Sequence, residues 1–225
     1  MLSRTLRALR KSPVDVPVTA SKFKLSCLFG GEMESTDMFW KNWFKASSAD
    51  ESAFLLYRNL VDQARVPQFY LNVGVPDTLD GRFDLIVLHM VVVIERLSVI
   101  GQNAKGLSQK LFDVMFDDMD QALREIGVGD LSVGKKVKTM ARAFYGRLGA
   151  YDEAFQAGTD VAIREVLKRN VFREADVAPE RLDALVVYTK AVRDVLDSTD
   201  LETFSAGAVA FPAAPEGVLP AEARS

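Results

Sequence analysis

The feature that most constrains the fold is an apolar run in the middle of the chain, Leu85 to Ile94, interrupted only by His89. Apolar residues in and around this run recur at helical spacing on one side, and further apolar residues fill the opposite side. A helix that is apolar all round lies in the centre of a fold. The β-branched residues 91–94 would also suit a strand, but the length of the stretch and the helical period around it favour a helix. The sequence therefore predicts a buried central helix from residue 80 or 81 to about Ile100, ended by Gly101.

The rest of the middle of the chain also has a helical period, and no alternation typical of strands persists. Pro67 and the segment Gly127-Val128-Gly129-Asp130 separate helices, and Pro179 stands in the first turn of the last one. The further helices are expected at about 50–66, 107–126, 133–148, 150–157, 160–172 and 179–196. We predict an all-α fold, with a single compact helical domain over residues 47–204 built around the buried central helix.

The two ends differ from this domain in composition. Residues 1–46 begin with basic residues and with leucines at helical spacing. This start fits a mitochondrial presequence, a contact with an anionic membrane or a frayed terminus. Aromatic residues interleaved with lysines at 39–45 suit a membrane interface, but docking on the domain is favoured. We expect residues 1–46 to be partly flexible or peripheral, and the Ala- and Pro-rich residues 205–225 to form a flexible tail.

Composition excludes several classes of protein. The 225-residue chain has a formal net charge of −3, one cysteine and one histidine. Cys27 has no partner for an internal disulfide, and His89 alone cannot build a His-rich metal site or a pair of imidazole catalysts. The longest apolar run is about half of the roughly 20 residues that a transmembrane helix needs, so we expect a soluble chain.

No candidate for catalysis survives inspection. Residues 129–136 satisfy the first seven positions of a phosphate-binding loop, but Lys136 replaces the Ser or Thr that holds magnesium, and a helix precedes the segment instead of a strand. Carboxylates at 113, 117, 118 and 120 lack the histidines of a di-metal bundle. His89 lies among apolar residues, which is typical of a hydrogen-bonded core histidine. We expect no enzyme, no metal and no cofactor.

One basic segment is the candidate binding surface. No acid occurs between Asp130 and Asp152. The candidate residues here are Lys135, Lys136, Lys138, Arg142 and Arg147. Three of them fall at i, i+3 and i+7 on one side of a helix. This stripe can meet RNA phosphates, anionic lipid or an acidic partner, and a solvated face paired with the neighbouring acidic helix remains open.

Arg82 is a second candidate contact. A structural role for its neighbourhood is favoured: Asp80 as the N-cap of the central helix, Phe83 packed, and Arg82 and Asp84 bonding across the loop.

Two stretches carry a resemblance to a known family. The first is Phe69-Tyr70-Leu71-Asn72-Val73-Gly74-Val75-Pro76-Asp77-Thr78-Leu79-Asp80-Gly81-Arg82-Phe83-Asp84, which leads into Leu88-His89. The second joins Leu123-Arg124-Glu125 to Gly127-Val128-Gly129-Asp130 and Val133-Gly134-Lys135-Lys136-Val137-Lys138. Over roughly residues 50–200 the chain resembles the ubiquinol–cytochrome c chaperone family, which contains assembly factors of the cytochrome bc1 complex.

The resemblance implies an all-helical protein without catalytic residues. Its implied client is newly made cytochrome b or another bc1 subunit, with the ribosome or a small partner assembly factor as further partners and no DNA. The short basic start and the Ala- and Pro-rich tail fit a location in the bacterial cytoplasm at the inner membrane, with the mitochondrial matrix as the alternative if residues 1–20 are cleaved. The alternative function is a membrane-peripheral or RNA-binding helical adaptor unrelated to bc1 assembly, followed by a small-molecule enzyme with a pocket near His89.

Overall fold

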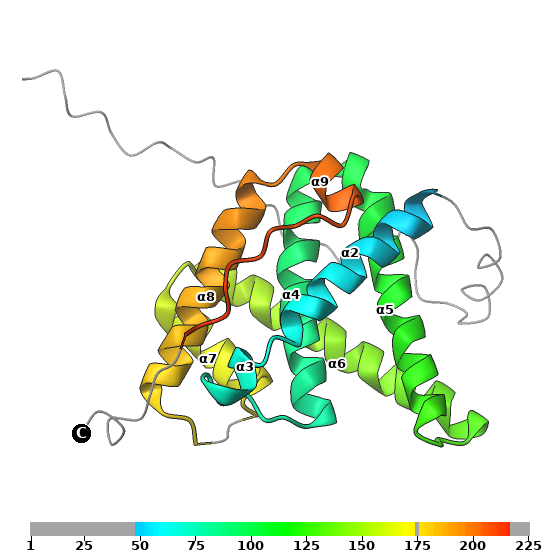
Figure 1. Cartoon of the computed structure of the whole chain (residues 1–225), viewed down its shortest axis with the longest axis horizontal. Coiled ribbons are helices and arrows are strands. Elements are labelled where there is room, and N and C mark those ends of the chain that lie inside the picture. The colour runs from blue at the N-terminus through cyan, green and yellow to red at the C-terminus, as the bar shows by residue number, and fades with distance from the viewer. Residues whose placement is uncertain (1–47, 174–175, 217–225) are drawn as a thin grey trace, which may run out of the picture. The chain divides into compact units, whose positions relative to one another are not determined.

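The computed structural model describes residues 48–173 and 176–216, which belong to the larger of the two compact units of the chain, Ser35–Ser225. These residues form helices joined by short turns, and no strand occurs within the two described ranges (Figure 1). The helices are α2 (Ser48–Ala64), α3 (Gln68–Leu71), α4 (Leu79–Ile100), the 3₁₀ helix η2 (Gln102–Ala104), α5 (Lys105–Glu125), α6 (Asp130–Ala157), α7 (Asp160–Asn170), α8 (Pro179–Ser198) and α9 (Leu201–Ser205). The predicted all-α fold is confirmed.

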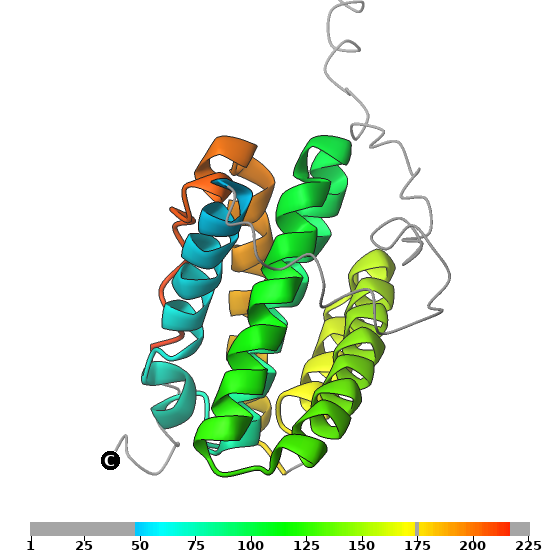
Figure 2. The same cartoon turned by 90° about the vertical axis from the view of Figure 1, so that its right-hand side faces the viewer.

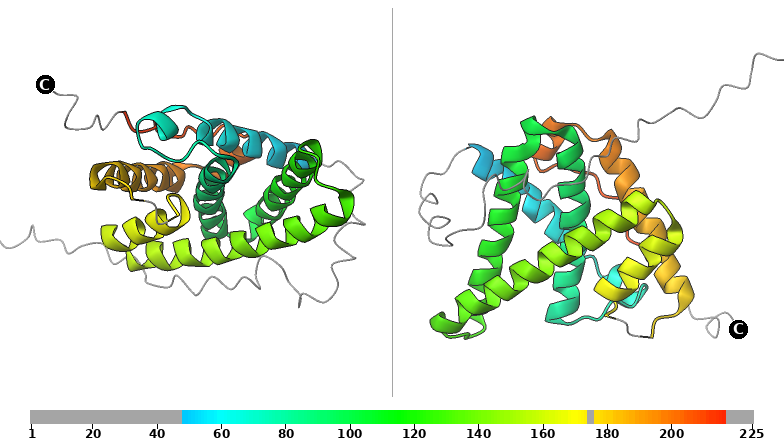
Figure 3. Two further views of the ribbon diagram at one scale, coloured as in Figure 1. Left: turned by 90° about the horizontal axis from the view of Figure 1, so that it is seen from below. Right: turned by 180° about the vertical axis from the view of Figure 1, so that it is seen from behind.

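Helix α4 is the central helix that the apolar run predicts. Its residues from Asp84 to Ile94 are all buried, which requires neighbours on every side. Seen nearly end-on in the left view of Figure 3, α4 lies between α2, α5, α6 and α8, and each of these four contacts it. Gly101 ends the helix with φ +91°, a backbone conformation that glycine adopts without steric cost.

Helix α7 lies outside this inner group, because it packs on α6 and α8 rather than on α4. Figure 2 shows α2, α5 and α6 as neighbouring ribbons, with α5 between the other two. The contacts agree, since α5 packs on both α2 and α6. Helix α6 therefore lies at one side of the domain, where half of its surface faces away from the core.

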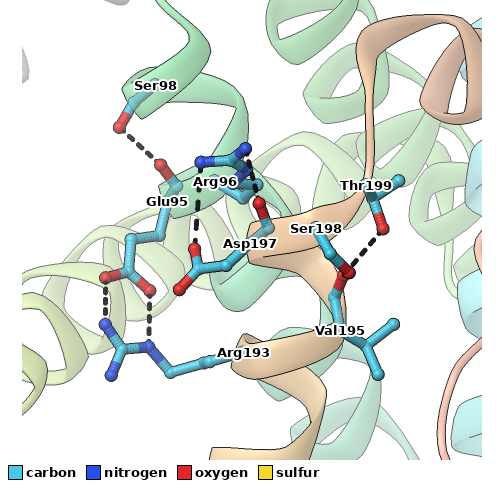
Figure 4. Close-up of polar contacts among 8 residues, drawn as sticks. All are labelled: Glu95, Arg96, Ser98, Arg193, Val195, Asp197, Ser198 and Thr199. Atoms are coloured by element: carbon cyan, nitrogen blue, oxygen red, sulfur yellow. Dashed lines mark hydrogen bonds and ion pairs between the residues drawn. The ribbon is translucent and has the colours of Figure 1, made fainter.

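Ion pairs link α4 to α8 at the ends of these helices (Figure 4). Arg193 of α8 donates two hydrogen bonds to the carboxylate of Glu95, at 2.8 and 3.1 Å, and its guanidinium lies 4.2 Å from the ring centroid of Phe155 in α6. Arg96 donates to the backbone oxygen of Asp197 at 2.9 Å. Burial raises the pKa of Glu95, while the hydrogen bond and charge of Arg193 oppose the rise. One arginine thus fixes α8 against both α4 and α6.

Helix α6 differs from the prediction, because one continuous helix replaces the two expected at 133–148 and 150–157. The buried residues Phe144, Leu148, Tyr151 and Phe155 follow one another at i, i+4, i+7 and i+11, so a single helix keeps them all on the core side. Gly149 lies inside this helix, where a glycine costs only about 1 kcal/mol. The burial of this stripe exceeds that cost.

The C-terminal segment also differs from the prediction. Residues 206–216 follow α9 as a largely extended strap, drawn in red in Figure 1, and Val209 and Ala214 within it are buried. The side-chain amide of Gln63 donates to the backbone oxygen of Pro212 at 2.9 Å. The flexible tail predicted over 205–225 is therefore wrong for its described part, because the count of Ala and Pro overlooked the apolar Val209 and Phe211. The predictions for residues 1–46 and for 217–225 lie outside the described residues.

Candidate functional site

The first half of α6 carries the cations that the sequence singled out. Lys135, Lys138 and Arg142 are exposed and lie on one side of the helix; we call these three residues the basic face. Lys136 is also exposed, but about 100° further around the helix than Lys135. The right-hand view of Figure 3 shows α6 crossing in front of α4 and α5, so that its outer side is uncovered by other described helices. The buried side chain of Val133 fixes this orientation.

The alternative that the basic face pairs with the acidic helix α5 is not supported. Asp118 accepts a hydrogen bond from the Tyr57 hydroxyl at 2.8 Å, and Asp120 accepts one from Arg124 at 2.6 Å, the i, i+4 pair that the sequence predicts. Within residues 48–173 and 176–216, the basic face and Lys136 form no ion pair. The cations of this surface are therefore available to another molecule.

Arg147 does not share this surface, although the sequence grouped it there. Its guanidinium binds the carboxylate of Asp84 at 2.7 Å and lies 5.5 Å from the ring centroid of Phe83. The side chain of Arg147 is 17% exposed and that of Asp84 is 0% exposed, so the pair is internal. Arg147 thus joins α6 to the start of α4.

A second arginine completes this pair and was missed by the sequence analysis. Arg173 donates to both oxygens of Asp84, at 2.7 and 3.3 Å, and to Asp80 at 3.1 Å. The pKa of Asp84 is raised because the carboxyl group is buried. The hydrogen bond from Arg173 and the charges of both arginines oppose this rise. No sequence pattern signals this contact, because 89 residues separate Arg173 from Asp84.

Arg82 lies in the first turn of α4. It pairs with Asp77 at 2.7 Å, and both side chains are 56% exposed. Its predicted partnership with Asp84 across the loop is wrong, since Asp84 binds the two other arginines. The predicted N-cap is also wrong: the hydroxyl of Thr78, and not Asp80, accepts a hydrogen bond from the Gly81 amide, at 3.1 Å.

The single histidine is a core residue, as predicted. His89 is 1% exposed; its Nδ1 donates to the Leu85 backbone oxygen at 2.8 Å, and its Nε2 accepts from the Tyr188 hydroxyl at 2.7 Å. The rings of Phe69 and Phe211 pack against it edge-on. Burial lowers the pKa of His89 to about 4, so the imidazole is neutral near pH 7. Both ring nitrogens are therefore engaged by hydrogen bonds within the core.

The helix–helix turn predicted over 129–136 is shorter and lies earlier in the chain: residues 126–129 join α5 to α6, and residues 130–136 already belong to α6. Gly127, with φ +84°, ends the turn after α5, and Gly129 is the N-cap of α6, so a helix precedes the segment and not a strand. No group of three or more metal-ligating side chains occurs among the described residues. Neither does any helix of this part of the chain have the length and apolarity that a membrane span requires.

The acidic cluster of α5 contains one unusual group. Burial, together with the nearby charges of Asp113 and Asp120, raises the pKa of Asp117 to about 6. Asp113, Asp117 and Asp120 are half-buried, whereas Asp118 is exposed.

These features define the class of protein as an all-α domain. Among the described residues, its buried ionisable groups stabilise the fold, and its outer side carries unpaired cations. A sequence model of the family described as ubiquinol-cytochrome C chaperone matches residues 71–211, and the chain belongs to this family. The resemblance that the two sequence stretches carry is thereby confirmed.

Individual relatives agree with this assignment. Ubiquinol-cytochrome c reductase complex assembly factor 1 of Mus musculus is 26% identical over 151 residues, which cover 67% of this chain and 51% of that protein. The Homo sapiens protein of the same name is also 26% identical over 151 residues, which cover 67% of this chain and 50% of the human protein. The chain thus spans about half the length of these curated relatives. The crystal structure of the Cbp3 homolog from Brucella abortus is similar with a TM-score of 0.66 and 33% identity, over 74% of this chain and 92% of that chain.

Proposed function

We propose that this protein is a non-enzymatic assembly factor of the ubiquinol–cytochrome c reductase (bc1) complex that binds newly made cytochrome b. The observation that carries the proposal is the family match over residues 71–211, supported by the names of the mouse and human relatives. The buried charged and aromatic clusters of the all-α domain hold its helices together. The exposed surface of the domain is what remains for a binding role.

A factor that holds an apolar client needs exposed apolar side chains at fixed positions. Leu71 is 75% exposed and Leu79 is 67% exposed, and they bracket the loop that enters α4. Both lie within the family match. Single exposed leucines are common on surfaces, but two on either side of one ordered loop make this region the candidate client contact.

The loop between these leucines is held rigidly. Val73 and Val75 are buried, at 1% and 2% exposure. Gly81 approaches the backbone oxygen of Pro76 so closely that a Cβ would collide with it. A rigid loop loses little conformational entropy on binding, which favours affinity. The arrangement supports a preformed contact for the client.

The proposed location is the bacterial cytoplasm at the inner membrane, with the mitochondrial matrix side of the inner membrane as the alternative. A client that is itself a membrane protein supports this location. The ribosome or a small partner assembly factor is a further proposed partner, in line with delivery of a newly made chain.

The test is deletion of the gene in the organism that encodes it, with reduced-minus-oxidised spectra of the membranes. We expect loss of the b-type haem signal of the bc1 complex while other respiratory complexes remain. The wild-type gene should restore the signal. Unchanged bc1 haem in the deletion strain would overturn the proposal and favour an adaptor unrelated to bc1 assembly.

A matched pair of variants tests the client contact in the same strain. The double variant L71D/L79D should fail to restore the signal, whereas V161D/V187D, at side chains that are 68% and 67% exposed on α7 and α8, should restore it. Full restoration by both variants would remove Leu71 and Leu79 from the proposal.

A further inference from the structure

We propose that the end of the α5–α6 hairpin docks on the surface of an anionic phospholipid bilayer. In this arrangement Ile126 and Leu131 enter the headgroup region, and the basic face binds lipid phosphates.

The apolar part of this surface is unusually exposed. Leu131 is 94% exposed, the highest value among the exposed large apolar side chains of the described residues, and Ile126, directly after α5, is 62% exposed. Leu131 cannot turn inward, because Val133 two residues later is fully buried and sets the rotation of α6. The hairpin therefore ends in two aliphatic side chains that face solvent.

The charged part continues on the same side of α6. Leu131 stands at i−4, i−7 and i−11 relative to Lys135, Lys138 and Arg142, so one stripe about 16 Å long runs from an aliphatic tip into three cations. An apolar tip followed by cations is the arrangement by which peripheral helices bind anionic membranes, since apolar burial and Coulomb attraction add.

The carboxylates at this end of the hairpin do not cancel the attraction. Arg124 pairs with both Asp120 and Asp130, so the acid next to Leu131 already has a cation beside it. Glu125 is the other acid here, and it accepts a hydrogen bond from Gln121 at 2.9 Å. Over residues 124–142 the cations outnumber the carboxylates.

A bilayer explains this surface better than RNA does. RNA phosphates would bind the basic face, but they give Leu131 and Ile126 nothing to contact. Proteins that bind single strands stack bases on aromatic side chains, and residues 130–143 contain no aromatic residue. An anionic bilayer surface offers phosphates for the cations and an apolar layer for the two aliphatic groups.

The inference rests on the proposed function for its biological setting, because a factor that hands over a membrane-protein client works at a membrane. The experiment below uses purified protein and vesicles and requires neither cytochrome b nor bc1 assembly. A failure of the docking site and a failure of the proposed function are therefore distinguishable.

The experiment reports the position of the hairpin end directly. The full chain carries C27S, and a single new cysteine is introduced by Ser132→Cys. The matched control is Ala157→Cys, at the other end of α6. Both native residues are exposed. Each variant is labelled with an environment-sensitive dye and mixed with phosphatidylcholine vesicles that contain or lack phosphatidylglycerol. We expect a blue shift only for the dye at 132, only with phosphatidylglycerol, and loss of the shift at high salt.

Binding variants add a quantitative arm, measured by vesicle co-sedimentation of the full chain. K135E/K138E/R142E should weaken partitioning into phosphatidylglycerol vesicles about 100-fold, and I126A/L131A should weaken it about tenfold. The triple variant R58E/R65E/R169E, at exposed arginines elsewhere, makes the same change in net charge and should have a far smaller effect.

Three results would overturn the inference. An unshifted dye at 132 while the protein sediments with the vesicles would place the membrane contact elsewhere in the chain. A second contradicting result has two parts: the chain binds a uridine-rich RNA strongly and K135E/K138E/R142E abolishes this binding, while I126A/L131A binds vesicles like wild type. This result would assign the basic face to nucleic acid. Binding of neither vesicles nor RNA would leave an acidic protein as the partner and would also refute lipid docking.

Discussion

Replacing Arg147 with Met should destabilise the protein, whereas the same change at Arg142, five residues earlier on α6, should not. The two arginines were indistinguishable as members of one basic segment. The structure separates them, because Arg147 is 17% exposed and bound to the fully buried carboxylate of Asp84, while Arg142 is exposed and unpaired within the described residues.

The size of the effect follows from what Asp84 retains. Breaking a buried ion pair by removing one partner costs about 3–5 kcal/mol when the remaining charge has no other partner, and loss of the guanidinium over Phe83 adds about 0.5 kcal/mol. Arg173 still donates to both oxygens of Asp84, which limits the damage. We therefore expect Arg147→Met to lower the free energy of unfolding by about 2 kcal/mol, equivalent to a Tm lower by roughly 4–8 °C.

Urea unfolding followed by far-UV circular dichroism measures this change. Arg147→Met should lower the midpoint at an unchanged slope, and Arg142→Met should stay within about 0.5 kcal/mol of wild type. Equal stability of the two variants would refute the internal role of Arg147.

Three further predictions follow from the described contacts. Gly81→Ala should lower the free energy of unfolding by more than about 3 kcal/mol or prevent folding, because the new Cβ would meet the Pro76 backbone oxygen. Gly149→Ala, in open space within α6, should raise the free energy of unfolding by up to about 1 kcal/mol. A reversal of this order in urea unfolding would contradict the geometry around Gly81. Because the pKa of His89 is lowered to about 4, the unfolded chain binds the extra proton between pH 6.5 and 4, and stability should fall by about 3 kcal/mol as the pH drops through that window. His89→Gln should remove this part of the pH dependence, and an unaltered pH profile in that variant would show that other groups cause it. Val209→Asp should release the C-terminal strap and raise the hydrogen-exchange rates of its backbone amides, whereas Ala210→Asp, at an exposed neighbour, should not. Equal protection of residues 206–216 in the two variants would mean that Val209 does not hold the strap.

The sequence predicts the helices well where a local signal marks their limits. The apolar period of α4, Gly101 after it and Pro179 at the start of α8 are such signals, and both of these helices lie within a few residues of their predictions. The division of α6 into two expected helices is wrong, because its buried stripe continues past residue 148. The strap at 206–216 was missed because Ala and Pro dominated its composition, whereas its binding depends on Val209 and on one hydrogen bond from Gln63.

The candidate surface was predicted in part, for a similar reason. The exposed positions of Lys135, Lys138 and Arg142 follow from helical spacing, which is local. The internal role of Arg147 depends on Asp84, whose burial in turn depends on Arg173 from a distant turn. Such three-way contacts between distant segments leave no trace in one sequence. Leu131 and Ile126 were overlooked because only the fold shows that nothing covers them.

The most direct test of the account is the capture of the client itself. The tagged chain is expressed in the organism that encodes it, membranes are opened in mild detergent, and newly labelled proteins bound to the tag are quantified with L71D/L79D as the matched control. The account predicts that newly made cytochrome b is enriched with the wild-type chain and lost with the variant. Enrichment of other respiratory subunits without cytochrome b would contradict it.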